Sequence, residues 1–464
     1  MVVLDKHGQD ADIVRGRPEY AWFVVAMLTL AYMCSYIDRQ IINLMVEPIK
    51  QDLHLNDTRM SLLQGAAFAV AYLIFTPILG RRVDTGNRKN IIAIAVLAWC
   101  GSTLLGGFAN NVTWLFISRA GVGAAEAALA PAAFSIIADY FPSERLPRAI
   151  GVFTMGPYLG GGFALIVGGA LIGSSGDLVR SFDFLGNLAP WQLTFILVGL
   201  MGLPLGAAVF MLKEPVRRAT SGAVEGDRHF STLETLSYLW QRRAFYLRFF
   251  GMMAFTVVVF YSMPAWIPTI LIRRYGSATG EVGLIYGTIV LVVGTLGVLA
   301  GPQLERCLHK RGYTSAGILC IAFASAGLVP TSLALFFFKS SAAVMVIGAI
   351  ATFLYSMPQP IAASALQIVT PNRMRGVTSA IYVIIVSAIG LGIAPTLVAL
   401  VTDFVFVDEK AVAASLALVC STSAVIATWL AQSTRKPFVD ALVAEESVAL
   451  PTLEAKTSAS EPGG

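Results

Sequence analysis

The chain has 464 residues, of which 56% are hydrophobic and only 13% are charged, and its mean hydropathy is +0.71. Soluble domains carry about 25% charged residues, so a soluble fold of this size would lack the charges needed to cover its surface. A bilayer removes that demand, because lipid-facing positions are apolar. The net charge of +5 comes from basic residues spread over loops, so we expect no nucleic-acid partner.

Cysteine and histidine, which form metal sites, disulfides and proton relays, are sparse in this chain. The five cysteines are scattered without a C-x-x-C pair, and the four histidines fall in tails or at the ends of apolar runs. This pattern predicts no metal site, no disulfide framework and no buried histidine relay. There is no G-x-x-x-x-G-K-[ST] loop, so ATP bound to this chain is not the expected energy source. No cofactor is expected.

In chain order, residues 1–19 are predicted to be a polar cytoplasmic tail without the features of a signal peptide. Twelve apolar runs follow, each long enough to span a bilayer. They form an N-terminal six-helix bundle over 20–212 and a C-terminal one over 244–434, which is an all-α integral membrane fold. The predicted spans are 20–47, 57–80, 89–109, 112–140, 146–173, 190–212, 245–272, 280–303, 314–337, 341–367, 374–404 and 411–433.

The stretch 213–243 between the two sets is predicted to be a cytoplasmic linker. Apolar residues recur in it at helical spacing, which is typical of a helix on the membrane surface, and a plain linker is the alternative. These residues are Phe230, Leu233, Leu236, Leu239 and Trp240. The tail 435–464 is rich in Glu, Ser, Ala and Thr, so we expect it to be disordered.

The loops on the side of the N-terminus carry most of the Lys and Arg residues. Basic residues accumulate in cytoplasmic loops. Both termini are therefore predicted to be cytoplasmic.

Two loops are duplicated along the chain. Gly80 precedes Asp84 by four residues after the second span, and Gly301 precedes Glu305 by four residues after the eighth. A Pro-led loop ends in Arg145 after the fourth span, and a similar one follows the tenth. Matched loops at nearly one offset predict two related halves, which is typical of transporters that rock around a central site.

We expect these loops to form a cytoplasmic gate, because an acid there can cap a helix or bind an arginine across that face. The alternative is that their basic residues only set the topology. The gate candidates are Gly80, Asp84, Arg88, Lys89, Arg145, Glu305, Arg306, Arg373 and Arg375.

A glycine, an acid and then Arg and Lys between the second and third spans resemble the signature of the major facilitator superfamily. Further motifs resemble its spinster family, although Thr85 stands where a basic residue is usual and Leu146-Pro147 where Arg-Gly would be. The resemblance implies alternating access and an amphipathic substrate such as a lysophospholipid or a sphingoid lipid. The motifs are Ser35-Tyr36-Ile37-Asp38-Arg39, Asp84-Thr-Gly-Asn87-Arg88-Lys89, Arg119-Ala-Gly-Val-Gly123-Ala-Ala-Glu126-Ala-Ala-Leu-Ala-Pro131 and Ile137-Ala-Asp139-Tyr-Phe-Pro142.

Four charges stand out deep inside the predicted spans: Asp38, Arg39, Arg119 and Glu126. Placing a charged side chain at the bilayer centre costs about 2.5–3.5 kcal/mol, so we expect these charges to have a function. Asp38 and Arg119 lie at similar depths and are expected to pair, while Glu126 lies near mid-membrane. Burial favours a protonated carboxyl and a nearby arginine favours the anion, so the cluster is predicted to bind substrate and couple protons. A permanent salt bridge is the alternative, as is an Arg39 that points out toward the interface.

The remaining candidates line the expected cavity or bend a helix. Aromatic and amide groups on the C-terminal half suit the apolar part of an amphipathic ligand, with ordinary packing as the alternative. The cavity candidates are Tyr36, Gln64, Tyr158, Tyr261, Trp266, Tyr286, Tyr355, Gln359 and Tyr382. In the fifth span Gly156, Pro157 and Gly160 resemble the glycine-proline signature of antiporters and are predicted to form a bend.

The sequence thus favours a proton-coupled secondary transporter of amphipathic molecules, monomeric, in a bacterial-type inner membrane, and not an enzyme. The runner-up is a proton-coupled carrier of small organic anions, in which Arg39 and Arg119 would clamp a carboxylate. A membrane-embedded enzyme or a transporter-like receptor is disfavoured, because no ligand cluster or nucleophile–base pair stands out.

Overall fold

The computed structural model of the chain describes residues 18–142, 145–181, 188–217, 232–371 and 374–458. These residues form helices and connections without a strand, and twelve helical spans in them are long and apolar enough to cross a membrane. The N-terminal half comprises α2 (Pro18–Gln40), η1 (Ile41–Leu44), α3 (Val46–Leu53), α4 (Asp57–Ser61), η2 (Leu62–Ala66), α5 (Ala67–Thr85), α6 (Arg88–Gly106), α7 (Val112–Glu126), α8 (Leu129–Tyr140), α9 (Leu146–Thr154), α10 (Gly156–Ser181) and α11 (Pro190–Phe210).

The second set of helices follows residue 231. It comprises α12 (Thr232–Gln241), α13 (Arg243–Tyr275), α14 (Thr279–Lys310), α15 (Ala316–Phe337), α16 (Ser341–Ser356), α17 (Pro358–Ile368), α18 (Arg375–Ser387), η5 (Ala388–Ile393), α19 (Ala394–Leu400), η6 (Val401–Phe406), η7 (Glu409–Ala411) and α20 (Val412–Ser458). We call residues 18–212 the N-terminal half and 243–443 the C-terminal half.

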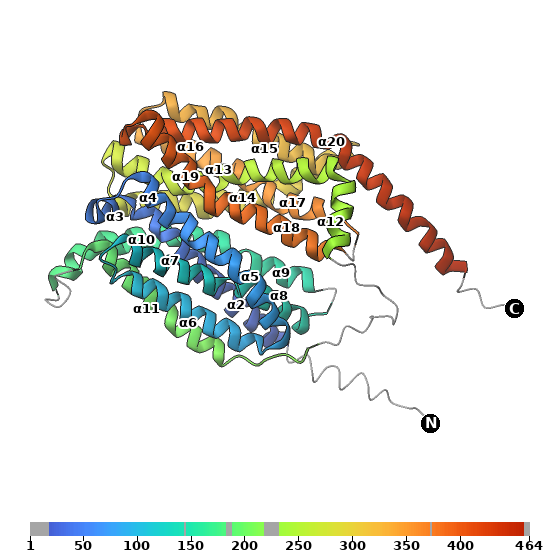
Figure 1. The fold of residues 1–464 in the computed structure, drawn as a ribbon, viewed down its shortest axis with the longest axis horizontal. Coiled ribbons are helices and arrows are strands. Elements are labelled where there is room, and N and C mark those ends of the chain that lie inside the picture. Colours follow the sequence, from blue (N-terminus) through green and yellow to red (C-terminus); the bar gives the residue numbers. More distant parts are fainter. Residues whose placement is uncertain (1–17, 143–144, 182–187, 218–231, 372–373, 459–464) are drawn as a thin grey trace.

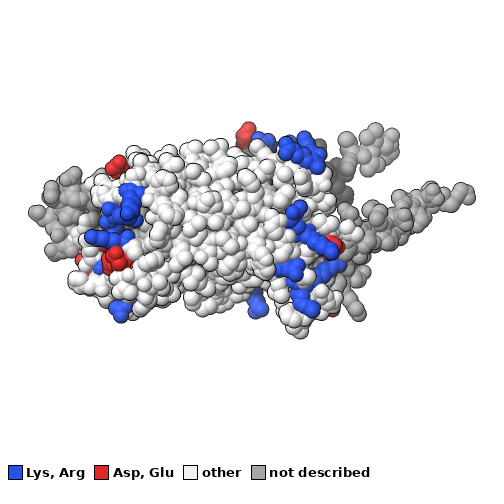
Figure 2. Space-filling model, turned by 90° about the horizontal axis from the view of Figure 1, so that it is seen from above, with Lys and Arg blue, Asp and Glu red and all other residues white. Residues whose placement is uncertain are grey.

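The spans lie roughly side by side along the long axis of the molecule (Figure 1). The short helices α3 and α4 lie at one end, which we call the Arg273 end. At the opposite end α12 runs across the direction of the spans, and we call this the linker end. Figure 2 shows Lys, Arg, Asp and Glu gathered toward the two ends, with a broad uncharged belt between them. Such a belt suits the hydrocarbon core of a bilayer.

Local chemistry fixes where several spans begin and end. Asn87 and Asn111 accept hydrogen bonds from backbone N–H groups of the first turns of α6 and α7, at 3.0 and 2.8 Å. Side chains in this position satisfy donors that have no partner in the helix itself. Helix α13 ends at Tyr275 and is followed by Gly276, whose φ of +66° lies in the left-handed region that glycine adopts without strain.

Two spans are interrupted at matching positions of the halves. The fourth span breaks between α7 and α8 at Ala127–Ala128, and the tenth breaks between α16 and α17 at Met357, just before Pro358. A proline inside a helix removes a backbone hydrogen bond, which explains the second break. Matching breaks agree with the duplication read from the loops.

Three clusters of buried apolar side chains form the core. The largest lies toward the Arg273 end and contains residues of both halves, for example Ile41 and Met45 with Trp266 and Ile270. The second cluster belongs to the N-terminal half apart from Leu391, and the third belongs to the C-terminal side of the chain. The halves therefore share a core at the Arg273 end and have separate cores at the linker end.

The structure differs from the sequence prediction in the C-terminal tail. A disordered segment was expected from residue 435, but α20 continues through it to Ser458. Phe438 and Ala441 are buried in the cluster that contains Phe245 of α13, so apolar packing holds this part of the helix. Part of the predicted linker is helical, as α12; Phe230 and the tail 1–17 lie outside the described residues.

Candidate functional site

A cavity of about 140 Å³ lies between the two halves. Its lining from the N-terminal half comes from α2, α5, α7 and α8, and its lining from the other half comes from α13, α18 and η5. The residues are Tyr32, Ser35, Tyr36, Arg39, Tyr72, Glu126, Leu129, Ala130, Tyr261, Val383, Ser387 and Leu391. A cavity lined by both halves is where a rocking transporter would hold its substrate.

An ion pair between Arg39 and Glu126 forms part of the wall of this cavity. Arg39 Nη2 lies 2.5 Å from Glu126 Oε2, and Ser35 Oγ donates to the same oxygen at 3.0 Å. The other carboxylate oxygen, Oε1, is buried and has no hydrogen-bond partner among the described residues. Glu126 is the last residue of α7, at the break in the fourth span. The carboxylate is therefore bound through one oxygen only, in the wall of the cavity.

Aromatic rings surround the Arg39 guanidinium. Its Cζ lies 4.3 Å from the ring centroid of Phe68 and 4.5 Å from that of Tyr36, with Tyr72 at 6.0 Å. Such contacts attract a cation and become stronger when water is excluded. Arg39 consequently points to Glu126 and does not extend toward the membrane interface, which was one alternative.

The expected pair between Asp38 and Arg119 is not formed. Both residues are fully buried, but Arg119 Nη1 donates to the backbone carbonyl of Asp38 at 2.8 Å, and both Asp38 carboxylate oxygens lack a hydrogen-bond partner in the described part of the chain. Helical depth alone placed the two at one level, but the Asp38 carboxylate lies beside the sulfur atoms of Cys34 and Cys100. The structure thus replaces the predicted pair by Arg39–Glu126.

Two of the nine predicted cavity residues line the cavity, and three others are packed in the core. Tyr36 and Tyr261 are in its wall. Trp266, Tyr286 and Tyr355 are buried in the shared core, and Trp266 Nε1 donates to the Pro395 carbonyl at 3.0 Å. Packing, the alternative considered for each aromatic, applies to these three because their helices turn them toward the core.

The other four predicted cavity residues also lie outside its wall. Gln64 Nε2 donates to Asn43 Oδ1 at 3.1 Å and to the Ala265 carbonyl at 3.5 Å, so it bridges the two halves. The ring of Tyr382 packs against Phe249 and Phe250. The other two residues, both partly buried, are Tyr158 and Gln359.

The fifth span is divided where the glycine-proline motif predicted a bend. Helix α9 ends at Thr154 and α10 begins at Gly156, followed by Pro157. A Cβ on Gly156 would lie 2.9 Å from Tyr32 Cβ, and one on Gly160 would lie 2.6 Å from the Met33 carbonyl oxygen. These glycines bring α10 close to α2, which carries Arg39.

At the linker end, Arg88 is buried at 1% exposure and binds partners in its own half and at the start of the linker. Its Nε donates to Glu214 Oε1 at 2.7 Å, its Nη2 to the Pro215 carbonyl at 3.0 Å, and its Nη1 to Asp139 and to Ser135. The predicted role of Arg88 in a contact between halves is not seen in this state. Glu214 was missed, although it follows the sixth span directly.

The remaining gate candidates form few contacts. The backbone carbonyl of Asp84 accepts from Arg217, and Lys89 Nζ donates to the Phe210 carbonyl at 2.8 Å. Arg375 Nε donates to the Thr370 carbonyl at 3.0 Å. Arg373 lies outside the described residues. Gly80 has open space at its Cβ position, Glu305 is partly buried, and Arg145 and Arg306 are exposed.

The sequence analysis missed an ionic network at the Arg273 end. Arg273 binds both oxygens of buried Asp57, at 2.7 and 2.8 Å, and Glu47 at 2.6 Å, while Lys50 binds Asp57 and, at 3.1 Å, Glu409. The Asp57, Glu47 and Lys50 side chains belong to one half, and Arg273 and Glu409 to the other. The network therefore ties the halves together.

A second contact lies beside this network. Asp403 Oδ2 accepts from the backbone N–H of Thr58 at 2.7 Å and from its hydroxyl at 2.6 Å. In the described part of the chain, every ion pair that joins the halves lies at the Arg273 end. The sequence offered one signal, namely acidic residues close to basic ones in the short loops of this end, of which only the basic residues entered the topology prediction.

Three possible metal-binding side chains come together inside the N-terminal half. Sulfur and carboxylate atoms of Cys34, Cys100 and Asp38 lie within 4.8 Å of one another. Scattered positions in the sequence had argued against any such group. The fold brings the first and third helical spans together, which sequence spacing could not show.

Comparison with known proteins matches this architecture. The model of the Major Facilitator Superfamily matches residues 28–395. An MFS-type efflux pump of Mycolicibacterium smegmatis is 28% identical over 66% of this chain, and the chain spans 65% of the length of that pump. Protein spinster homolog 1 of Xenopus tropicalis is 28% identical over 86% of this chain and 76% of that protein.

A solved structure is similar over nearly the whole chain. It is a bacterial homologue of the human lysosomal transporter spinster in an inward-facing, unoccupied conformation, with a TM-score of 0.73, 25% identity, and coverage of 92% of this chain and 95% of that one. The expected fold and the expected class, a multi-pass membrane transporter and not an enzyme, are confirmed by these relatives. The chain belongs to the Major Facilitator Superfamily and is a spinster-like transporter within it.

Proposed function

We propose that the chain is a proton-coupled secondary transporter of an amphipathic molecule with an anionic head group, such as a lysophospholipid. The observation that carries this proposal is the Arg39–Glu126 pair in the wall of a cavity between the halves, with Glu126 Oε1 unpaired. The linker end, where basic residues are abundant, faces the cytoplasm in this proposal.

The coupling follows from competition for Arg39. An anionic head group that binds the guanidinium draws it away from Glu126. The buried carboxylate that remains would be an uncompensated charge, which is unfavourable by several kcal/mol, so it takes up a proton. Substrate binding and proton binding then favour each other, and by linkage each raises the affinity for the other.

The state of the structure suits this cycle. The Arg273 network and the shared core close one end, and the separate cores at the linker end support a state open to the cytoplasm. The similar bacterial structure is inward-facing and unoccupied. In the opposite state the bonds of Arg273 to Asp57 and Glu47 would separate.

Cavity size favours a second candidate, a proton-coupled carrier of small organic anions. A volume of about 140 Å³ holds a short carboxylate more readily than an acylated molecule. In that case Arg39 clamps the carboxylate and the apolar wall only excludes water.

Proton movement in sealed proteoliposomes with a pH dye inside separates the candidates. The proposal predicts a dye response to a lysophospholipid, lost in Glu126→Gln and retained in Glu281→Gln. Glu281 provides the matched control because it carries the same group on the exposed first turn of α14. A response to a dicarboxylate alone would establish the second candidate, and an intact lipid response in Glu126→Gln would refute the coupling role.

A further inference from the structure

Helix α12 at the linker end presents three different faces. Thr235 and Leu239 are buried against the protein. An exposed apolar stripe runs along a second face and consists of Leu233 (77% exposed), Leu236 and Trp240 (65% exposed). The third face is polar and exposed and consists of Glu234, Ser237 and Gln241. A helix with adjacent apolar and polar faces suits the boundary between lipid and water.

A depression of about 540 Å³ opens where α12 passes into α13. Its lining consists of Gln241, Arg243, Ala244, Leu247 and Arg248. Both arginines are exposed, and neither forms an ion pair with a described residue. The guanidinium carbon of Arg243 lies 5.5 Å from the ring centroid of Trp240, and Arg248 Nη1 donates to the Ser433 carbonyl at 3.1 Å.

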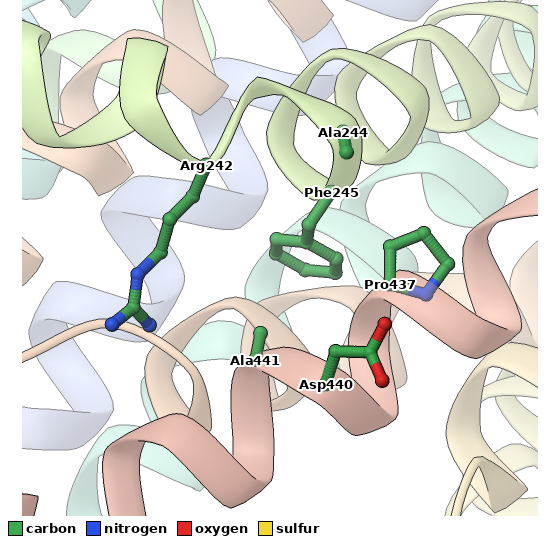
Figure 3. A pocket seen from close by; sticks show the side chains of 6 residues that line it. All are labelled: Arg242, Ala244, Phe245, Pro437, Asp440 and Ala441. Carbon is green, nitrogen blue, oxygen red and sulfur yellow. The ribbon is translucent and has the colours of Figure 1, made fainter.

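Asp440 of α20 lines a different depression. Figure 3 shows Asp440 and Pro437 of α20 facing Phe245, with Arg242 on the other side of that ring. No carboxylate of a described residue lines the Arg243–Arg248 depression, so it has an uncompensated positive charge.

The depth of the depression matches the headgroup layer. Helix α13 has 33 residues, which is about 50 Å at 1.5 Å per residue. The hydrocarbon core is about 30 Å thick, or about 40–45 Å with its headgroups. The first turns of α13, with Arg243 and Arg248, therefore reach the headgroup layer.

We propose that this depression binds the phosphodiester of an anionic phospholipid from the leaflet at the linker end. Arg243 and Arg248 hold the phosphate oxygens, because guanidinium groups match phosphate geometry. The stripe of Leu233, Leu236 and Trp240 contacts the acyl chains. The bound lipid fixes α12 to the start of α13, at a site separate from the cavity between the halves.

Native mass spectrometry of the full chain, delipidated and titrated with phosphatidylglycerol or phosphatidylcholine, tests this proposal. Each arginine near a membrane surface contributes roughly a fivefold change in affinity, so Arg243→Gln or Arg248→Gln weakens phosphatidylglycerol binding about fivefold and the double variant about 25-fold. The matched control is Arg311→Gln, an exposed arginine after α14 at the same end, which leaves binding unchanged.

Three results would overturn the proposal. One is equal binding of the two lipids by the wild-type chain, since phosphatidylcholine carries no net charge. Another is unchanged phosphatidylglycerol binding in the double variant. The last is competition by glycerol phosphate as effective as by the lipid, because the apolar stripe would then contribute nothing and the ligand would be a free phosphate.

Discussion

The two ends of the molecule use buried charge in different ways. At the Arg273 end, ion pairs of Arg273 and Lys50 cross between the halves above a core that both halves share. At the linker end, where the cores are separate, the more deeply buried Arg88 binds Asp139 of its own half and Glu214 directly after that half. The ion pairs at the Arg273 end can break when the halves rock. The ion pairs of Arg88 instead hold helices on one side of the molecule together. The difference predicts that mutations at the two ends have different consequences.

The largest expected effect is that of Arg88→Met on folding. The substitution leaves the carboxylates of Asp139 and Glu214 without this arginine, and removing one member of a buried ion pair costs about 3–5 kcal/mol. Thermal unfolding in detergent, followed by circular dichroism, measures the loss. The control Lys89→Met removes a single bond to the Phe210 carbonyl, worth about 1 kcal/mol. Equal stability of the two variants would contradict the account of Arg88.

Next is Arg273→Met, which changes the balance of states. Only Lys50 would then compensate the charges of Asp57 and Glu47. The state that is closed at the Arg273 end is therefore destabilised, relative to the open state, by up to about 3–5 kcal/mol. Spin-label distances between Arg59→Cys and Lys339→Cys should lengthen, and those between Arg81→Cys and Lys310→Cys should shorten.

The neighbouring residue provides the control for that experiment. Arg274 forms no ion pair with a described residue and stacks on Tyr275 at 5.8 Å, so Arg274→Met should leave both distances as in the wild-type chain. Unchanged distances in Arg273→Met would show that the network does not hold the end closed.

A smaller effect is expected where α10 and α14 pack through glycines. A Cβ on Gly283 would lie 2.4 Å from the Leu165 carbonyl oxygen, so Gly283→Ala forces the helices apart and costs about 1–3 kcal/mol. It should slow transport in proteoliposomes. Gly173→Ala, whose Cβ would lie 4.0 Å from Gly280, should not. Wild-type rates in Gly283→Ala would show that this contact is not needed for rocking.

The smallest effect is that of Asp403→Asn. The substitution keeps one acceptor oxygen for Thr58 but removes the charge, so the contact between the halves weakens by about 1 kcal/mol. The same spin-label pair at the Arg273 end should show a modest rise in the open population. A shift as large as that of Arg273→Met would assign the main contact to Asp403.

Sequence reasoning predicted the fold more completely than the site. Span length, loop charge and the duplicated Gly80–Asp84 and Gly301–Glu305 loops are local patterns, and they gave the twelve spans. Asp38, Arg39, Arg119 and Glu126 were singled out because a charge in lipid is expensive wherever it lies. Which of these side chains form an ion pair depends on the rotation of α2 against α7 about their axes. The depth of the residues in the membrane does not give this rotation, and it favoured Asp38–Arg119 over the pair that forms, Arg39–Glu126.

The Arg273 network could not be found in the same way. Glu47, Lys50 and Asp57 are more than 200 positions from Arg273 in the chain, and charges at span ends are common for topology alone. Their burial depends on the two halves meeting at that end. Trp266 and Tyr286 were misplaced for a similar reason, because an aromatic residue in an apolar span gives no sign of whether it faces cavity or core.

Proton uptake on substrate binding tests the central claim most directly. Detergent-solubilised chain in weakly buffered solution at neutral pH is mixed with lysophosphatidylglycerol while a pH indicator and lipid binding are recorded together. The account predicts that the wild-type chain takes up protons as it binds lipid, and that Glu126→Gln binds lipid without proton uptake. Lipid binding by the wild-type chain with no proton uptake, or equal uptake by Glu126→Gln, would contradict it.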